Sequence, residues 1–314
     1  MNNSDRTLVG RSADDHTPTS VCIAIVLYHN SLDELWRCVR AVRRSVDHAL
    51  ANEQSALGAI RISMGDCSDR PALSEDDVNA FRADLDPRVS VSYQWFAKNL
   101  GHSAGANALA RNATDDALLF LNPDTYMAPT SLTALLRSLR DPCVSAVDAR
   151  QIPCEHPKAY DPISGDQSWA SGACLLVRSS RFHEISGFDA ATFPSYVNDV
   201  DLSWRLRLHN GRVVHQPRAA VFHDKRLDKN ACVQPTKTEL HQALLGRLLL
   251  ATKYGRPDIV SQTLELVEAH GGPKQLLAAQ DFGRRRNSGV LPNAVPGGDG
   301  VAQFVEGEYA SKLY

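Results

Sequence analysis

The sequence has no paired cysteines, no long hydrophobic run and no excess of charge of one sign. Its seven cysteines occur without a Cys-x-x-Cys pair, so neither a zinc site nor a disulfide framework is indicated. The longest apolar run near the C-terminus, residues 243–251, is interrupted by Gly246 and Arg247 and is too short to cross a bilayer. The formal net charge of -2 gives no electrostatic argument for a nucleic-acid partner.

Residues 1–19 are polar and contain no apolar stretch that could act as a secretory signal. We therefore expect a disordered segment there and a cytoplasmic protein. The overall composition, with 43% hydrophobic and 22% charged residues over 314 positions, is that of an ordinary globular protein. A chain of this length fits one large domain with an appendage.

Short apolar strands alternate with amphipathic helices through the first half of the chain. Residues 21–28 form a continuous apolar, β-branched run, which is typical of a strand buried on both faces of a parallel sheet. Ser31 and Glu34 then form a capping box that opens a helix. The alternation predicts an α/β fold with a mostly parallel central sheet. Further strands are expected at residues 59–64, 89–93, 117–121, 144–147 and 173–177, and further helices from residues 74, 103, 129 or 130, and 179.

The pattern changes after residue 150. Residues 151–166 are rich in proline and lose periodicity, which fits either an active-site loop or an irregular insertion. Helical patterns at 236–254, 257–270 and 273–286 predict a helical C-terminal appendage. We therefore divide the chain into a catalytic domain at 20–231, the appendage at 232–286 and an irregular tail at 287–314.

The stretch from Gly187 to Arg205 combines aromatic and acidic residues and then begins an amphipathic helix. Asp199 and Asp201 are two residues apart, so they cannot share a helix face. Asp201 stands four residues before Arg205, and this spacing favours an ion pair on the helix. Asp199 remains free at the helix start, where packing of the helix would hold it in one direction. A rigid carboxylate of this kind suits a general base.

Three other motifs are weaker when each is taken alone. Asn122-Pro123-Asp124 directly follows an apolar strand, where ligands of α/β sheets bind, although a simple turn explains it equally well. Residues 99–107 place two glycines at a helix start, which fits either approach of backbone amides to a phosphate or a tight connection. His223 follows an apolar run, and a single histidine there is more often structural.

Taken together, these motifs resemble family 2 glycosyltransferases of the GT-A fold, especially bacterial rhamnosyltransferase-like members of cell-surface polysaccharide assembly. The resemblance covers residues 21–223 and depends on several motifs that occur in order. They are Val26-Leu27-Tyr28-His29-Asn30, residues 99–107, Asn122-Pro123-Asp124, Ser171-Gly172-Ala173, Gly187-Phe188-Asp189, Asn198-Asp199-Val200-Asp201-Leu202 with Arg205, and His223.

The resemblance implies a role for each motif. Asp199 would be the catalytic base, and Asp124 and His223 would bind Mg²⁺ or Mn²⁺. The nucleotide-binding positions would be Tyr28, Asn30, Asp66, Asn99, Gly101, Asn107 and Asn122. The positions near the donor sugar or the acceptor would be Trp169, Gly172, Ala173, Asp189, Asn198, Asp201 and Arg205.

The chain departs from the family pattern at two places. The family commonly has Glu before its catalytic Asp, whereas Asn198 stands here, which keeps a hydrogen-bonding side chain but removes a charge that would raise the pKa of the base. After the second strand the family often has Val-Asp-Asn-Gly-Ser. Here residues 63–69 read Ser-Met-Gly-Asp-Cys-Ser-Asp, so either Asp66 or Asp69 corresponds to the nucleotide-binding position.

We therefore expect an inverting glycosyltransferase that moves a sugar from a nucleotide-diphospho-sugar, of dTDP or UDP type, to a glycan or lipid-linked acceptor. Rhamnose is favoured by the resemblance alone. A nucleotidyltransferase is one alternative, but it normally has a Gly-rich, basic loop where this chain has Tyr28-His29-Asn30-Ser31. A catalytically inactive sugar-nucleotide-binding protein of the same fold is the other.

The sequence leaves the setting of the protein open. Arg284-Arg285-Arg286 fits either contact with an anionic membrane surface, such as the inner face where lipid-linked acceptors lie, or a solvated helix face. A homo-oligomer is equally compatible with the sequence.

Overall fold

The computed structural model describes residues 19–52, 57–225, 227 and 234–313. The expected disordered segment at 1–19 lies outside the described residues except for Thr19, which begins a strand. The expected boundary between residues 231 and 232 also lies outside them.

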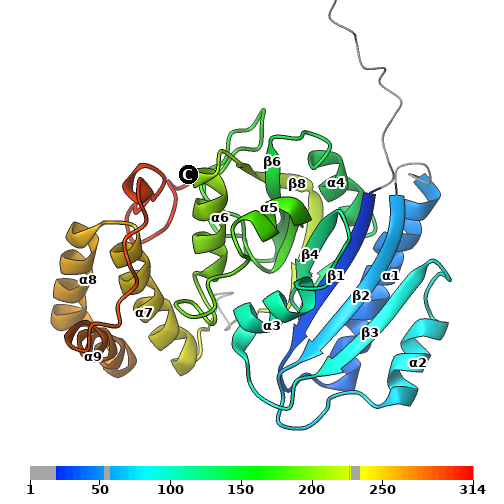
Figure 1. Cartoon of the computed structure of the whole chain (residues 1–314), viewed down its shortest axis with the longest axis horizontal. Helices are drawn as coiled ribbons and strands as arrows, with labels where there is room; N and C mark the ends of the chain where they lie inside the picture. The colour runs from blue at the N-terminus through cyan, green and yellow to red at the C-terminus, as the bar shows by residue number, and fades with distance from the viewer. Residues whose placement is uncertain (1–18, 53–56, 226, 228–233, 314) are drawn as a thin grey trace, which may run out of the picture.

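Within the described residues, eight strands form one mixed sheet in the order β3-β2-β1-β4-β7-β6-β8-β5 (Figure 1). The four strands from β3 to β4 are all parallel, β7 runs antiparallel to both neighbours, and β6 is parallel to β8. The expected mostly parallel sheet is confirmed. The strands are β1 Thr19–Leu27, β2 Leu57–Asp66, β3 Val89–Trp95, β4 Ala117–Leu121, β5 Thr125–Met127, β6 Val144–Ile152, β7 Cys174–Arg178 and β8 Arg212–His223.

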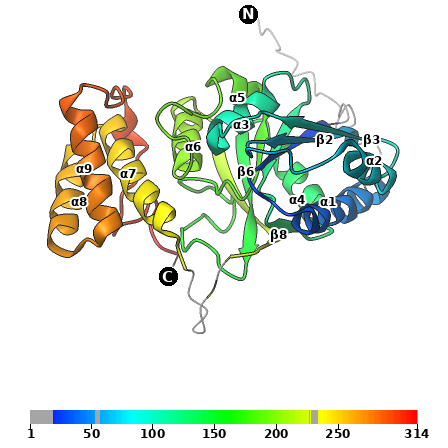
Figure 2. The same ribbon diagram turned by 90° about the horizontal axis from the view of Figure 1, so that it is seen from below.

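Helices cover both faces of this sheet, because side chains of each strand alternate between two apolar clusters. In β1, Val21 and Ile23 face a cluster that includes α1, α2 and α4, whereas Cys22 and Ala24 face a cluster that includes α3, α5 and α6. The sheet is therefore the middle layer of three (Figure 2). The helices are α1 Leu32–Asn52, α2 Glu75–Ala83, α3 Gly101–Ala110, α4 Ser131–Ser138, α5 Ser179–Glu184, α6 Asn198–Leu208, α7 Lys237–Lys253, α8 Pro257–His270 and α9 Pro273–Asn287.

The last three helices, in the part of the chain that the sequence analysis divides off as an appendage, lie together beside α6 (Figure 1). Trp204 of α6 packs edge to face against Tyr254 at the end of α7, with ring centroids 4.8 Å apart. On α9, Arg284 forms an ion pair with Asp281, and the Arg286 guanidinium lies over a phenylalanine ring of the same helix. These contacts support a solvated helix face. No helix in the described part of the chain is long and apolar enough to cross a bilayer.

Some element boundaries differ from the sequence expectation. The strand β8 begins at Arg212, seven residues before the apolar run that marked it, because its first half pairs with β6 through polar as well as apolar positions. The three-residue strand β5 was too short to predict. Ser179 is the first residue of α5 and makes no side-chain cap.

The segment after Asn287 has little regular structure, yet it folds back onto the loop between β6 and β7. The N–H of Ala159 donates to the carbonyl of Ser311 at 2.7 Å, and the N–H of Leu313 donates to the carbonyl of Pro157 at 3.0 Å. The irregular tail is thus fixed against the proline-rich loop.

Candidate active site

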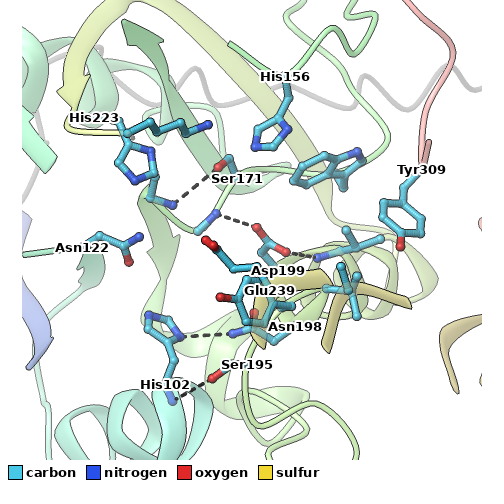
Figure 3. Close-up of a pocket in the computed structure, with 18 of the residues that line it drawn as sticks. His102, Asn122, His156, Ser171, Ser195, Asn198, Asp199, His223, Glu239 and Tyr309 are labelled. Carbon is cyan, nitrogen blue, oxygen red and sulfur yellow. Dashed lines mark hydrogen bonds between the residues drawn. The ribbon is translucent and has the colours of Figure 1, made fainter. Parts of the chain in front are cut away.

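A cavity of about 600 Å³ lies where β4 ends and β7 begins, above the start of α6 (Figure 3). Eight of the residues predicted for the site line it, which brings together positions more than one hundred residues apart in the chain. They are Asn122, Asp124, Trp169, Gly172, Ala173, Asn198, Asp199 and His223.

Asp199 is held by hydrogen bonds to both of its carboxylate oxygens. The N–H of Gly172 donates to Oδ2 at 2.9 Å, and the N–H of Val200 donates to Oδ1 at 2.9 Å. The carboxylate expected to be free at the helix start is therefore fixed in direction. Burial raises the pKa of Asp199 above its ordinary value, although these N–H groups and Lys158 act in the opposite direction. A raised pKa makes this carboxylate a stronger base.

An unusual backbone turn aims the start of α6 at the cavity. Tyr196 and Val197 have φ angles of 57° and 51°, which residues other than glycine rarely adopt. Helix α7 approaches this turn so closely that a Cβ on Gly246 would lie 2.6 Å from Cγ2 of Val197. Gly246, which interrupts an apolar run in the sequence, therefore allows the appendage to pack on the turn before Asp199.

Asn198 connects α6 to α3 through a neutral histidine. Its Nδ2 lies 3.2 Å from Nδ1 of His102 and donates to it when that nitrogen is unprotonated. Burial lowers the pKa of His102 to about 4, so the imidazole is uncharged at neutral pH. The amide thus occupies a position where a carboxylate would favour protonation of this ring.

Asp124 and His223 meet at the cavity, with Nε2 of His223 3.6 Å from Oδ1 of Asp124. The antiparallel pairing of Thr125 with His223, between β5 and β8, brings them together. Nδ1 of His223 lies 2.8 Å from Oε1 of Gln151, an acceptor, so Nδ1 carries the proton and the lone pair of Nε2 faces Asp124. This arrangement fits a divalent cation.

The cation would have few protein ligands. Among the residues that the structure describes, no three His, Cys, Asp or Glu side chains are grouped to hold a metal ion. Asp124 and His223 would supply two ligands and leave the remaining positions to phosphate oxygens and water, as for metals that bind phosphorylated substrates.

A chain of hydrogen bonds connects His223 with Asp199. Gln151 accepts from His223 and donates through Nε2 to Oγ of Ser171 at 2.8 Å. The next residue, Gly172, donates its N–H to Asp199. The two predicted functional groups are therefore positioned by one connected network, in which Gln151 and Ser171 had no predicted role.

A buried carboxylate, Asp148 of β6, supports this network from below. Its Oδ2 accepts from the N–H of Ser171 at 2.7 Å and from Nζ of Lys158. Its Oδ1 is 2.9 Å from both Nδ1 of His215 and Nε2 of Gln167. Burial acts to raise the pKa of Asp148, but Lys158 and His215 hold it far below its ordinary value. The sequence analysis did not find Asp148, since nothing marks it within an apolar strand.

Asp189, Asp201 and Arg205 do not line the cavity. Nε of Arg205 donates to Oδ2 of Asp201 at 2.8 Å, which confirms the ion pair inferred from their spacing. Nζ of Lys253 lies 2.6 Å from Asp201 and 2.7 Å from Asp189. Asp189 and Asp201 thus contact α7 through Lys253, and the expected role of Asp189, Asp201 and Arg205 near the sugar or the acceptor stays a prediction.

The other predicted nucleotide positions lie outside the cavity. Five of them lie at the ends of β1, β2 and β3, the parallel strands beside β4, and Asn107 lies within α3. Several of their side chains bond to backbone. Asn107 both accepts the N–H of Phe188 and donates to its carbonyl, at 2.9 and 2.8 Å. Asn30 accepts the N–H of Tyr28, and Asn99 accepts the N–H of Gly101. Gly101 has a φ of 74°. These residues shape the loops at this edge.

The structure distinguishes the two candidate aspartates after β2. Asp66 is fully buried and accepts from the N–H groups of Ser68 and Ala72 and from the hydroxyl of Tyr93 at 2.6 Å. Burial acts to raise its pKa, but the hydrogen bonds from Ser68 and Tyr93 outweigh burial and hold the pKa below its ordinary value. Asp69, by contrast, has a side chain that is 76% exposed. Only Asp69 presents its carboxylate to solvent.

Several cavity residues had no predicted role, although some of them, including His102 and Ser171, lie inside motifs quoted in the sequence analysis. Lys225, two residues after His223, is the only Lys or Arg among the described residues that line the cavity. Glu308 and Tyr309 come from the tail, where only the folded chain brings them to the site. The cavity residues without a predicted role include His102, His156, Ser171, Asp224, Lys225, Glu239, Glu308 and Tyr309.

Comparison with known proteins agrees with this geometry. The profile of glycosyl transferase family 2 matches residues 23–191. The N-acetylglucosaminyl-diphospho-decaprenol L-rhamnosyltransferase of Mycobacterium tuberculosis is 31% identical over 147 residues, which cover 35% of this chain and 48% of that protein. Rhamnosyltransferase WbbL of Escherichia coli is 29% identical over 143 residues, which cover 36% of this chain and 54% of that protein. The chain thus matches about half the length of these relatives.

A solved structure of GalNAc-T7 with UDP, GalNAc and Mn²⁺ shares the fold, with a TM-score of 0.57 at 13% sequence identity. The superposition covers 89% of this chain and 60% of that one. The GT-A fold and the rhamnosyltransferase-like resemblance inferred from the motifs are confirmed. The chain belongs to glycosyl transferase family 2.

Proposed function

We propose that this protein is an inverting, metal-dependent glycosyltransferase that uses a nucleotide-diphospho-sugar. The observation that carries the proposal is the convergence of Asp199 with the pair Asp124 and His223 in one cavity. The carboxylate of Asp199 can accept a proton, and Asp124 and His223 can hold the cation that a diphosphate requires. A nucleotidyltransferase has no need of a buried base in this position.

The charge of the cavity supports a divalent cation. Among the described residues that line it are five carboxylates and one ammonium group, that of Lys225. A donor diphosphate would be repelled by this surface unless a cation shared it. Asp124 and His223 would hold Mg²⁺ or Mn²⁺, which would neutralise charge that develops on the leaving diphosphate. Lys225 would bind the same phosphates.

Asp199 supplies the base for the transfer. The acceptor O–H gives its proton to the Asp199 carboxylate, and the oxygen forms a bond to the anomeric carbon. The bond from that carbon to the diphosphate oxygen breaks, and its electron pair leaves with the nucleoside diphosphate. Attack from the face opposite the leaving group inverts the anomeric centre. Gly172 and Val200 hold the base in line through their N–H groups.

The nucleotide would lie along the ends of β1 and β2, next to the cavity. Tyr28 is 52% exposed. The next residue, His29, has its Nδ1 3.6 Å from the exposed carboxylate of Asp69, which brings Asp69 near Tyr28. We assign the base or ribose contact to Asp69 and Tyr28, and leave Asp66 with the ordering of the loop. The names of the rhamnosyltransferase relatives favour rhamnose as the sugar and a glycan or lipid-linked acceptor. The dTDP or UDP type of the donor stays the expectation from the resemblance of the motifs.

Thermal denaturation with UDP and dTDP, each with and without Mn²⁺, tests this function. One nucleotide with Mn²⁺ should raise the Tm by an amount that grows with its concentration, and Asp124→Ala and Lys225→Met should each reduce the shift. Release of nucleoside diphosphate from the matching nucleotide-sugar would support the proposal. Release of pyrophosphate from a nucleoside triphosphate and a sugar phosphate would favour a nucleotidyltransferase, and binding without turnover would favour the inactive alternative.

Replacement of Gln151 by Leu should lower the affinity for Mn²⁺ by about 10- to 100-fold, since the lost acceptor no longer fixes the His223 tautomer. Calorimetric titration of Mn²⁺ in the presence of the bound nucleotide measures this. Gln216→Leu is a matched control, because Gln216 donates to Ser138 and does not line the cavity. If Gln151→Leu binds Mn²⁺ as tightly as the wild type while Asp124→Ala binds it more weakly, Gln151 has no positioning role.

A further inference from the structure

Residues 305–313 of the tail form one side of the cavity, and the donor chemistry proposed above does not use them. Glu308 and Tyr309 both line the cavity. The carbonyl of Tyr309 accepts from Oγ of Ser168 at 2.8 Å, and the carbonyl of Gly307 accepts from the Arg247 guanidinium at 2.8 Å. Together with the backbone bonds from Ala159 and Leu313, these contacts fix the segment in place.

The same side of the cavity is aromatic, and the Lys158 ammonium lies 4.5 Å from the centroid of the Trp169 ring. The ring of Trp169 packs edge to face against Tyr309, with centroids 6.5 Å apart, and against His156, with centroids 5.2 Å apart. Burial lowers the pKa of His156 to about 3, so this imidazole is neutral. The Arg247 guanidinium lies 5.7 Å from the centroid of the Tyr309 ring and supports it. We name Trp169, His156 and Tyr309 the aromatic wall.

The aromatic wall lies close to the base. In the view of Figure 3, Asp199 lies between His223 and Tyr309. Burial raises the pKa of Tyr309 to about 12, and the carboxylates of Glu308 and Asp199 act in the same direction. A molecule held against the wall would therefore lie beside Asp199, on the opposite side of this residue from the diphosphate site.

Two carboxylates as well as the Lys158 ammonium are among the polar groups near the wall. Glu308 adjoins Tyr309, and Glu239 at the start of α7 adds a second carboxylate to the cavity. Carboxylates accept hydrogen bonds from sugar hydroxyls and repel anions. The flat faces of aromatic rings suit the apolar C–H face of a pyranose. An uncharged pyranose ring matches both properties, whereas the carboxylate of a uronic acid would meet Glu308.

From these contacts we propose that residues 305–313 complete an acceptor subsite for an uncharged pyranose, with Tyr309 against the sugar face and Glu308 accepting from its hydroxyls. The inference rests on the proposed function, because the sugar hydroxyl must reach Asp199. It adds that the selectivity for the acceptor resides in the tail, outside the part of the chain that the family profile matches.

Saturation-transfer NMR with methyl glycosides of glucose, galactose, N-acetylglucosamine, rhamnose and glucuronic acid tests the subsite, in the presence of Mn²⁺ and whichever of UDP and dTDP binds. At least one neutral glycoside should bind the wild type. Tyr309→Ala should bind it about tenfold more weakly, and Tyr309→Phe should bind it normally because the ring remains. Methyl glucuronide should bind more weakly than methyl glucoside, and Glu308→Gln should reduce that difference.

Equal binding by Tyr309→Ala and the wild type, or a preference for the glucuronide, would overturn the subsite, as would the absence of binding of every neutral glycoside. Glu308→Gln preserves shape, so it decides the question if Tyr309→Ala does not fold. The Tm shift with nucleotide and Mn²⁺ tests the proposed function separately from the acceptor subsite. If the wild type shows that shift and the glycoside results fail, only the subsite is wrong. If no nucleotide shifts the Tm, the proposed function itself fails.

Discussion

Asp199→Asn is expected to reduce the rate of sugar transfer by about 10²- to 10⁴-fold, the usual contribution of a general base. The amide keeps an oxygen that can accept from Gly172, so the loop before β7 should retain its conformation. Affinity for the nucleotide with Mn²⁺ should be nearly unchanged, since Asp124 and His223 are untouched. The measurements are kcat for transfer and the nucleotide-dependent Tm shift.

The matched control is Asp224→Asn, a carboxylate that lines the same cavity without contact to Asp199 in the described interactions. Its effect on kcat should be much smaller. Near-normal turnover of Asp199→Asn, or an equal loss in both variants, would remove Asp199 from the role of base.

The raised pKa of Asp199 also gives a stability effect with a definite sign. Burial disfavours the ionised carboxylate in the folded state, so the stability that the group contributes is present below its unfolded pKa, near the ordinary 3.8. It is lost as the pH rises through the raised folded value. Asp199→Asn should therefore raise the Tm at neutral pH and leave it unchanged at low pH. Over the same range, turnover of the wild type should fall as acid protonates the base.

Asp148→Ala is expected to lower the free energy of unfolding by about 3–5 kcal/mol, because it leaves the buried ammonium group of Lys158 uncompensated. The side chains of Asp148 and Lys158 are 1% and 5% exposed, so water cannot replace the lost carboxylate. Urea denaturation at neutral pH measures the change. Asp166→Ala is the control, since Asp166 forms partly exposed ion pairs with Arg207 and Arg212 and should contribute less than about 1 kcal/mol.

The dependence on pH distinguishes this explanation from simple loss of packing. The pKa of Asp148 is depressed in the folded protein, so its stabilisation is present above the unfolded aspartate pKa and is lost as the pH falls through the folded value. The difference in unfolding free energy between the wild type and Asp148→Ala should therefore narrow in acid. If Asp148→Ala lowers the unfolding free energy as little as Asp166→Ala does, or by an amount that does not change with pH, the electrostatic explanation is wrong.

The sequence predicted the parts of the site that depend on strand ends. Apolar runs identified β1 and β4, and parallel strands bring their carboxyl ends to one edge, so Asn122 and Asp124 were found at the cavity. The four-residue spacing on a helix correctly predicted the ion pair between Asp201 and Arg205. Asp199 then remained as the candidate base.

What the sequence could not show depends on contacts between distant segments. Asp148 lies in a buried strand, and its charge is satisfied by residues from ten to sixty-seven positions later in the chain. Tyr309 reaches the cavity only because backbone hydrogen bonds hold the tail against the proline-rich loop. Neither has a local pattern, since periodicity reports which face of an element is apolar and not which remote segment will cover it.

The close approach of Gly246 to Val197 joins the appendage to the turn before Asp199. The base, the turn, α7 and Tyr309 of the tail therefore belong to one packed unit that follows residue 191, where the family profile ends. The proposed donor side draws on both parts of the chain, because Asp124 precedes residue 191 whereas His223 and Lys225 follow it. An exchange of the chain after residue 191 between relatives would therefore move the base and Tyr309 together, and would carry two donor-side residues with them.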